Sequence, residues 1–213
     1  MTWEKFKAMP FKKKAEHIWE YYRWQILVTL VVVFFLGTWI RGIVTEKEPL
    51  MQVEMINAYG NTPDGEAFED FLQKAGREYY EDAVIVNTNI QMNGPDPTAN
   101  YASAQMLFCS LAAAEPDLIF WETDEIMPQL DGGQLLDLRE LLPEAVLKEY
   151  EDSLVYATMG DTEESYPCGI YLERNPWIME NKYYVNCTAS VSASCKDRDL
   201  AVQFLLYMLS WEK

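Results

Sequence analysis

One run of the sequence, WQILVTLVVVFFLGTWI at residues 24–40, contains no charged side chain, and Arg41 follows it directly. At about 1.5 Å per residue this run forms roughly 25 Å of helix, and the residues on either side supply the rest of a bilayer crossing. Aromatic side chains lie at both ends of the run, as they do at the two interfaces of a membrane: Trp19, Tyr21, Tyr22, Trp24 and Trp39. The sequence therefore predicts a transmembrane helix over residues 24–44.

We expect this helix to remain in the chain as a membrane anchor. The residues before it are too many for the basic region of a typical signal peptide, and neither a small-x-small cleavage site nor a lipid-accepting cysteine lies nearby. Basic residues are concentrated before the helix: Lys5, Lys7, Lys12, Lys13, Lys14 and Arg23. Because such segments stay in the cytoplasm, we predict a single-pass cell-membrane protein with residues 1–23 cytoplasmic, a linker at 45–50, and residues 51–213 extracytoplasmic.

The charge of the chain changes sign at this helix. Residues 1–44 hold seven of the 17 basic and three of the 34 acidic residues, which leaves 10 basic and 31 acidic residues beyond them. A domain with a net charge of −21 does not bind nucleic acid or an anionic membrane surface through electrostatics. We therefore expect no nucleic-acid partner and a soluble, acidic ectodomain.

Residues 51–122 alternate between strand and helix patterns. Strands are predicted at 51–59, 82–92 and 117–122, and helices at 62–79 and 98–115. The second helix is apolar over most of its circumference, so we expect it to be well buried. This order predicts an α/β fold with a mostly parallel sheet flanked by helices.

The second half of the domain is less regular. We expect a short helix at 123–130, a later helix interrupted by Pro143, and strands at 153–159, 168–173 and 182–193. Asp197 can cap a final helix whose apolar face holds Leu200, Ala201, Phe204, Leu205 and Met208.

The stretch PDLIFWETDEIMPQLDGGQLLDLRELLP at residues 116–143 carries a resemblance. Pro-Asp opens a buried strand, acidic residues end it, and a Pro-x-Leu element leads to glycines and Leu-Leu-Asp-Leu. In this order the chain resembles the first lobe of bacterial extracellular solute-binding proteins, the receptors of ABC importers, which have the type 2 periplasmic-binding fold. AVQFLLYMLSWEK is similar to the closing helix of that family, and SYPCGIYLERNPWI to its hinge strand. The resemblance implies one periplasmic-binding-protein-like lobe over residues 51–213.

The chain departs from that family in its length. Full members usually have two lobes, whereas residues 51–213 leave no room for a complete second lobe. A cleft that closes between two lobes therefore cannot form within one chain, and the sequence resembles a shortened, membrane-anchored version.

Catalytic arrangements find little support in the sequence. The only histidine, His17, precedes the predicted membrane span, so Ser-His-Asp, Cys-His and histidine-ligated zinc sites are excluded from the ectodomain. Acidic pairs at 124–125 and 163–164 have the chemistry of a glycosidase acid and base, but chance supplies such pairs among 31 acidic residues. The turn at 93–96 lacks the spacing of an EF-hand. We predict a protein that is not an enzyme and that uses no cofactor or metal.

Polar and aromatic residues follow the predicted strands, where open parallel sheets hold their ligands. Such residues suit a sugar or a peptide. The candidate ligand-binding residues are Tyr59, Asn61, Asn89, Trp121, Glu122 and Asp124 at the strand ends, with Tyr171 and Trp177 from the hinge-like segment.

Two functions remain open at this point. The first is a non-catalytic, membrane-anchored receptor or accessory subunit that binds a small solute and passes it to a transporter. The second is an interaction module that has kept the fold without the solute and docks on a membrane-protein complex.

All four cysteines lie in the ectodomain, where disulfides are permitted. Cys187 and Cys195 flank a short Ser-rich segment and form a candidate pair, whereas Cys109 lies in an apolar helical stretch where a free thiol is equally expected.

Overall fold

A computed structural model describes residues 10–45, 47–60, 62–63, 65–123, 130, 133–158, 164–172 and 175–210 of the 213. The chain forms two compact units, Met1–Lys47 and Glu48–Lys213, and each is described by itself.

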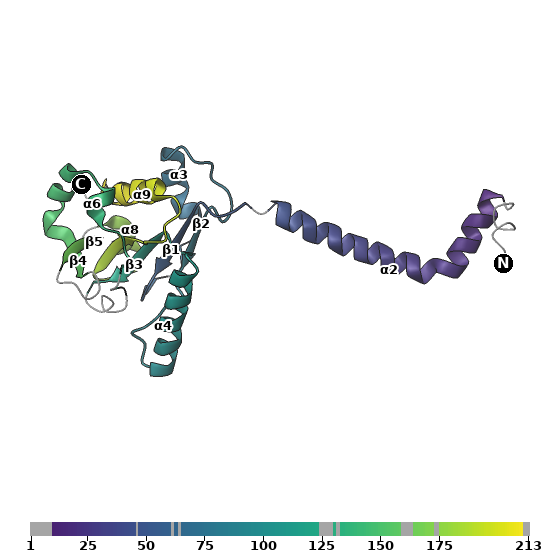
Figure 1. Cartoon of the computed structure of the whole chain (residues 1–213), viewed down its shortest axis with the longest axis horizontal. Helices are drawn as coiled ribbons and strands as arrows, with labels where there is room; N and C mark the ends of the chain where they lie inside the picture. The colour runs from purple at the N-terminus through teal and green to yellow at the C-terminus, as the bar shows by residue number, and fades with distance from the viewer. Residues whose placement is uncertain are drawn as a thin grey trace. The chain divides into compact units, whose positions relative to one another are not determined.

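The first unit consists of one long helix, α2 (Phe11–Thr45), which begins directly after Pro10 (Figure 1). Its segment Trp19–Arg41 is long and apolar enough to cross a membrane, two properties that a signal sequence shares. Large apolar side chains between Leu27 and Ile40 are exposed, which is unfavourable in water and favourable in lipid. The helix predicted over residues 24–44 is thus present; its orientation stays a prediction.

The second unit is built on one six-stranded sheet with the order β2-β1-β3-β6-β5-β4. Its strands are β1 (Met51–Met55), β2 (Val84–Asn87), β3 (Leu118–Glu122), β4 (Leu154–Thr158), β5 (Ser165–Tyr171) and β6 (Cys187–Val191). Strand β1 pairs in parallel with β2 and β3, whereas β6 runs antiparallel to β3 and β5, and β4 antiparallel to β5. The α/β prediction is confirmed, but the sheet is mixed, because only the first three strands are joined by the helical crossovers that parallel pairing needs.

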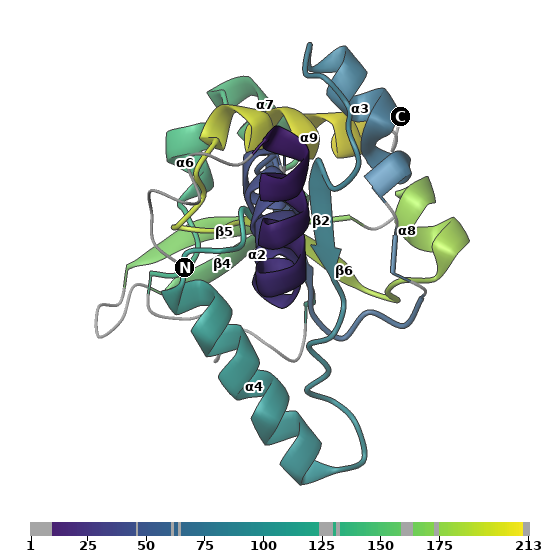
Figure 2. The same ribbon diagram turned by 90° about the vertical axis from the view of Figure 1, so that its right-hand side faces the viewer.

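Helices lie on both sides of this sheet (Figure 2). One side carries α3 (Glu69–Lys74), α6 (Leu138–Leu141), α7 (Glu144–Glu149) and α9 (Arg198–Ser210), with α8 (Pro176–Asn181) beside them; the other carries α4 (Pro97–Ala112). The 3₁₀ turns η1 (Gly65–Phe68) and η2 (Glu151–Ser153) precede α3 and β4. An aromatic cluster fills the first side, where Phe204 of α9 lies within 5.4 Å, ring to ring, of Phe68 and 4.9 Å of Phe71.

Local capping signals agree with the structure in the second half. Asp197 accepts a hydrogen bond from the backbone N–H of Leu200 (3.0 Å), and the predicted apolar face of α9 is buried. Helix α3 is shorter than the helix predicted over residues 62–79. It ends at Lys74, and Gly76 then adopts a positive φ of 70° that stops the helix. The short helix expected at 123–130 falls mostly outside the described residues.

Helix α4 is far more exposed than predicted. Only Ser103, Leu107 and Ser110 are buried, while Tyr101 is 66% and Phe108 50% exposed. The expectation of a well-buried helix was wrong. The helix is uncharged and rich in alanine, but burial also needs a second element packed against its outer face, and composition does not predict one.

The predicted disulfide between Cys187 and Cys195 is also wrong. All four cysteines are free thiols, with Cys168, Cys187 and Cys195 buried and Cys109 exposed. Cys187 is the first residue of β6 and Val191 is its last. At about 3.3 Å per residue these two ends lie about 13 Å apart, and Cys195 follows beyond Val191. The two sulfur atoms therefore lie toward opposite ends of β6, beyond the reach of a disulfide.

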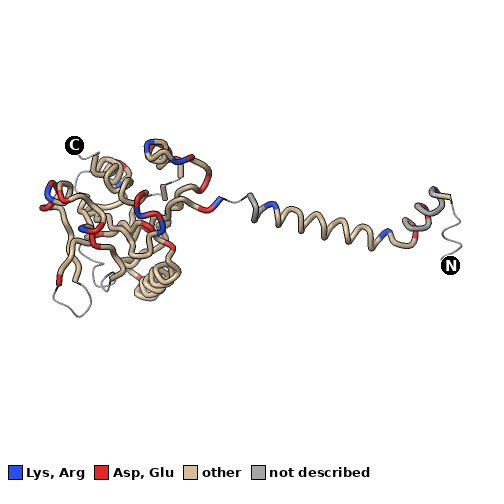
Figure 3. Tube along the Cα trace, turned by 45° about the horizontal axis from the view of Figure 1, so that its top comes forward, with Lys and Arg blue, Asp and Glu red and all other residues tan. Residues whose placement is uncertain are grey.

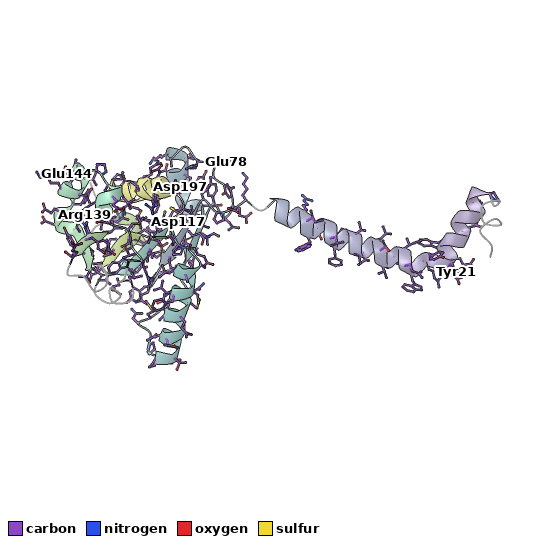
Figure 4. The ribbon with its side chains drawn as sticks, viewed as in Figure 1. Tyr21, Glu78, Asp117, Arg139, Glu144 and Asp197 are labelled. Carbon is purple, nitrogen blue, oxygen red and sulfur yellow. The ribbon has the colours of Figure 1, made fainter. Side chains whose placement is uncertain are left out.

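Asp117 joins three segments at the amino end of β3 (Figure 4). Its carboxylate accepts hydrogen bonds from the backbone N–H of Gln52 (2.9 Å) and of Lys196 (2.8 Å). Its own backbone N–H donates to Gln52 and its carbonyl accepts from Ser192, both at 2.9 Å. This one buried residue ties β1, β3 and the chain before α9 together.

Replacing Asp117 with alanine is expected to destabilise the ectodomain by about 2–4 kcal/mol, because two backbone donors lose their acceptor. Denaturant unfolding of residues 48–213 measures the change. Asp117→Asn, which keeps one acceptor oxygen, should lose about half as much. A loss of less than about 0.5 kcal/mol for the alanine variant, the range of an ordinary surface change, would show that these bonds are dispensable.

Candidate functional site at the carboxyl edge of β1 and β3

The chain reverses its winding direction between β1 and β3. From β1 it crosses to β2 on one side, and from β2 it returns through α4 to β3 on the other side of β1. Ligands of open α/β sheets bind at such switch points, outside the carboxyl ends of the strands. Because β6 is antiparallel, with Cys187 opposite Glu122, the segment leading into β6 arrives at the same edge.

Tyr59 connects the segments that meet there. Its backbone N–H donates to the carbonyl of Tyr183 (2.9 Å), which fixes the loop after β1 to the segment before β6. Its hydroxyl donates to Glu122 Oε2 (3.3 Å) and accepts from Asn93 Nδ2 (3.2 Å). Tyr59 nevertheless stays 60% exposed, so part of the residue is accessible to a ligand.

The loop that carries Tyr59 depends on two special backbone positions. Asn57, which is buried, has a positive φ of 59°, and its side-chain oxygen accepts from the N–H of Met92 (2.6 Å). At Gly60 an added Cβ would lie 2.5 Å from the ring of Tyr183, so only glycine permits this approach. Asparagine tolerates the left-handed region better than most residues, which is why this pair can turn the chain over the end of β1.

A basin opens beside Tyr59 with a volume of about 470 Å³, lined by Tyr59, Met179, Lys182, Tyr184 and Val185. Met179 and Val185 are exposed, whereas Tyr184 is buried and donates its hydroxyl to the carbonyl of Phe120 (3.1 Å). Burial raises the pKa of Tyr184 well above its ordinary value, so the hydroxyl stays neutral. The basin thus offers apolar and aromatic walls with one cation at its rim.

Lys182 holds an unusual conformation at this rim. It ends α8 with a φ of 56° and ψ of 37°, the left-handed position that glycine usually takes after a helix. For a residue with a Cβ, this left-handed backbone conformation costs about 1 kcal/mol or more relative to the right-handed one.

A second group of polar side chains continues along the same edge toward β5. The hydroxyls of Thr123 and Thr188 lie 2.7 Å apart, and the N–H of Thr123 donates to the carbonyl of Asn186 (3.3 Å). Tyr171 at the end of β5 donates its hydroxyl to Asn186 Oδ1 (3.0 Å). These bonds fix the floor of the edge between β3, β6 and β5.

The structure brings some of the predicted site residues together. Tyr59 and Glu122 are hydrogen-bonded, and Tyr171 lies further along the same edge. Asn61 and Asp124 lie outside the described residues. The direct contribution of any of these residues to binding stays a prediction.

The two tryptophans and Asn89 lie elsewhere. Trp121 is fully buried, and its indole N–H donates to Ser190 Oγ (2.9 Å). It is a core residue, so the prediction that it contacts a ligand was wrong. Side chains alternate along a strand, and its neighbour Glu122 therefore points the other way. Trp177 is half-buried against the rings of Phe68, Phe120 and Tyr183. Asn89 is exposed in a separate groove.

The sequence alone missed the residues contributed by α8 and the segment after it. Met179, Lys182, Tyr184 and Val185 reach the basin because α8 turns the chain back toward β6. The signal for this helix was present: Asn175 caps it by accepting from the N–H of Ile178 (3.2 Å), and Pro176 takes its first position.

The groove around Asn89 contains a buried carboxylate. It has a volume of about 300 Å³ and is lined by polar and apolar residues of β1 and β2, together with Asn89 and Glu115. Glu54, 4% exposed, accepts from Asn87 Nδ2 (2.6 Å) and from the hydroxyl of Ser110 (3.4 Å). Burial, and to a lesser extent the charge of Glu115, raises the pKa of Glu54 from 4.5 to about 7, although the bond from Ser110 lowers it.

No cluster of three or more His, Cys, Asp or Glu that could hold a metal occurs within the described part of the chain. Comparisons with models of known protein families, with curated proteins and with solved structures found no match.

The raised pKa of Glu54 predicts that stability falls with rising pH. The folded domain keeps the proton up to about pH 7 while the unfolded chain releases it near pH 4.5. Stability is therefore lost between these two values, by roughly 3 kcal/mol, and levels off above them. Denaturant unfolding of residues 48–213 at several pH values measures this loss.

Glu54→Gln is the matched variant, because the amide keeps the shape and the bond from Asn87. It should remove most of this pH dependence and be more stable than the parent above pH 7. Glu115→Gln removes a charge that raises the pKa of Glu54. The decline should therefore still begin near pH 4.5 but end at a lower pH than in the parent. An identical pH profile for the parent and Glu54→Gln would contradict the assignment.

Proposed function

We propose that the chain is a single-pass membrane protein whose extracytoplasmic domain binds a small solute, a sugar or a short peptide, at the carboxyl edge of β1 and β3. In this proposal residues 1–23 are cytoplasmic, α2 spans the bilayer, and the domain is a shortened relative of the solute-binding proteins. It acts as a receptor or accessory subunit for a membrane transporter and carries out no catalysis.

The observation that carries the proposal is the basin beside Tyr59. Its position at the switch point of the sheet is where α/β folds hold ligands. Its volume of about 470 Å³ is sufficient for a small molecule. Tyr59 is exposed and offers an aromatic surface, and Glu122 and Asn93, which already bond its hydroxyl, supply a polar acceptor and donor beside that hydroxyl.

Lys182 adds a second argument for this location. A residue held in an unfavourable backbone region is a reason to look for a function of its side chain. Lys182 takes a position where glycine would be more stable, and its side chain lines the basin. An ammonium group there can pair with the carboxylate of a peptide, whereas a neutral sugar does not need it.

The alternative function is a protein-interaction module of a membrane complex that retains the fold without a solute. The observation in its favour is the exposure of the basin walls, since Met179 is 51% and Val185 74% exposed. Such apolar side chains at an open edge also suit a partner protein. In this case no small solute would stabilise the domain, and Val185→Asp would weaken assembly in the membrane.

A thermal-melt panel of sugars, short peptides and amino acids against residues 48–213 tests the proposal. A ligand at 100 times its dissociation constant adds about 2.7 kcal/mol and raises the melting temperature by several degrees. Tyr59→Ala should lower the apparent affinity for the ligand, obtained from the concentration dependence of the melting shift, at least tenfold. Lys182→Gly should keep or raise the stability of the free domain. It should weaken the binding of a peptide and leave the binding of a sugar unchanged.

Asn89→Ala is the matched control, because Asn89 is exposed at a strand end but lies in the separate groove. It should bind like the parent. A shift that Asn89→Ala abolishes and Tyr59→Ala leaves intact would place the ligand in that groove, and the absence of any saturable shift would support the interaction module instead.

A further inference from the structure

Helix α4 presents an uncharged surface on a strongly acidic domain. Residues 97–114 contain no Asp, Glu, Lys or Arg, although residues beyond 44 hold 31 acidic side chains. Figure 3 shows this helix without a charged position, in contrast to the segments around it. This uncharged helix also leaves the large apolar side chains of Tyr101, Met106 and Phe108 exposed, as a contact surface does.

The outer side of α4 has the spacing of a helix-packing face. Opposite the buried stripe run exposed residues at steps of four and three: Thr98, Ala102, Gln105, Cys109 and Ala112. At 100° per residue, Tyr101 and Phe108 flank this stripe on one side and Met106 on the other. Steps of four and three are those with which two helices interlock. We call this surface the outer face of α4.

We propose that the outer face of α4 pairs with the same face of a second copy of this chain in the membrane. A partner with a basic surface would be drawn to the acidic remainder of the domain, and α4 offers it no charge to pair. Two acidic copies repel each other, but physiological salt screens charges more than about 8 Å apart, so the repulsion is weakest where both contact surfaces are uncharged. The chain itself supplies such a face. In a two-fold pair the rings of Tyr101 and Phe108 pack onto the small side chains of the partner helix.

The size of this face explains why the membrane is needed. A helix of 16 residues is about 24 Å long and roughly 10 Å wide, which offers far less than the about 800 Å² per partner of a stable interface in solution. Anchored copies share one plane and one orientation, which raises their effective concentration. The inference therefore rests on the proposed anchoring by α2 and is independent of solute binding.

Cys109 makes the pairing measurable, because it lies in the middle of the outer face and is exposed. The other three thiols are buried. Burial, followed by the charge of Asp117, also raises the pKa of Cys195 to about 12, which suppresses its reactivity. A thiol-specific crosslinker will therefore report on Cys109.

The full-length chain is reconstituted in phosphatidylcholine vesicles at low density and treated with a short bismaleimide. We expect a crosslinked dimer that Cys109→Ser abolishes. Ala112→Glu, which keeps the thiol and places a carboxylate in the contact, should lower the dimer fraction at least fivefold. Tyr156→Glu on β4, where Tyr156 is 50% exposed, is the matched control and should dimerise like the parent.

Melting curves of each variant confirm that it is folded. Equal crosslinking of the parent and Ala112→Glu would identify random collision and overturn the inference. So would the lack of a dimer when Cys109 still reacts with a monofunctional maleimide, or a crosslink in cell membranes to a chain of different mass in place of the dimer. Removal of the protein from the vesicles by alkaline extraction would overturn the proposed anchoring, and with it this inference, while leaving solute binding untouched.

Discussion

The carboxylate of Asp117 holds the sheet at the point where its parallel half meets its antiparallel half. It accepts from the backbone of Gln52 at the start of β1 and from Lys196 before α9. A buried carboxylate with two backbone donors is stable, because its lost hydration is replaced by hydrogen bonds. This contact sets where β1 and β3 begin and therefore where their carboxyl ends lie.

The carboxyl ends are the place where the fold assembles its candidate site. The loop from β1 turns through Asn57, approaches Tyr183 through Gly60 and delivers Tyr59 to Glu122. The segment before β6 reaches the same edge because β6 is antiparallel to β3. A fully parallel sheet would have brought the end of β6 there instead of its beginning. The mixed topology thus supplies Lys182, Tyr184 and Val185 to the basin.

The sequence predicted those features that depend on local chemistry. The apolar run before Arg41, the positions of β1 and β3, and the cap at Asp197 follow from composition, periodicity and a single side chain. The strand-end rule placed Tyr59 and Glu122 at one edge of the sheet, where the structure joins them by a hydrogen bond; their role in binding stays a prediction. Features that depend on distant partners were not found. Trp121 follows the same strand-end rule as Glu122 but faces the core, and α4 has the composition of a buried helix without a covering element.

The most direct measurement of the central claim is a two-dimensional amide NMR titration of residues 48–213 with the sugars and short peptides of the panel. Binding at the carboxyl edge predicts saturable shift changes at Tyr59, Asn93, Glu122 and residues 182–186, and unchanged signals in α4 and around Asn89. Shift changes confined to other parts of the domain, or no saturable change with any member of the panel, would contradict a solute site at the ends of β1 and β3.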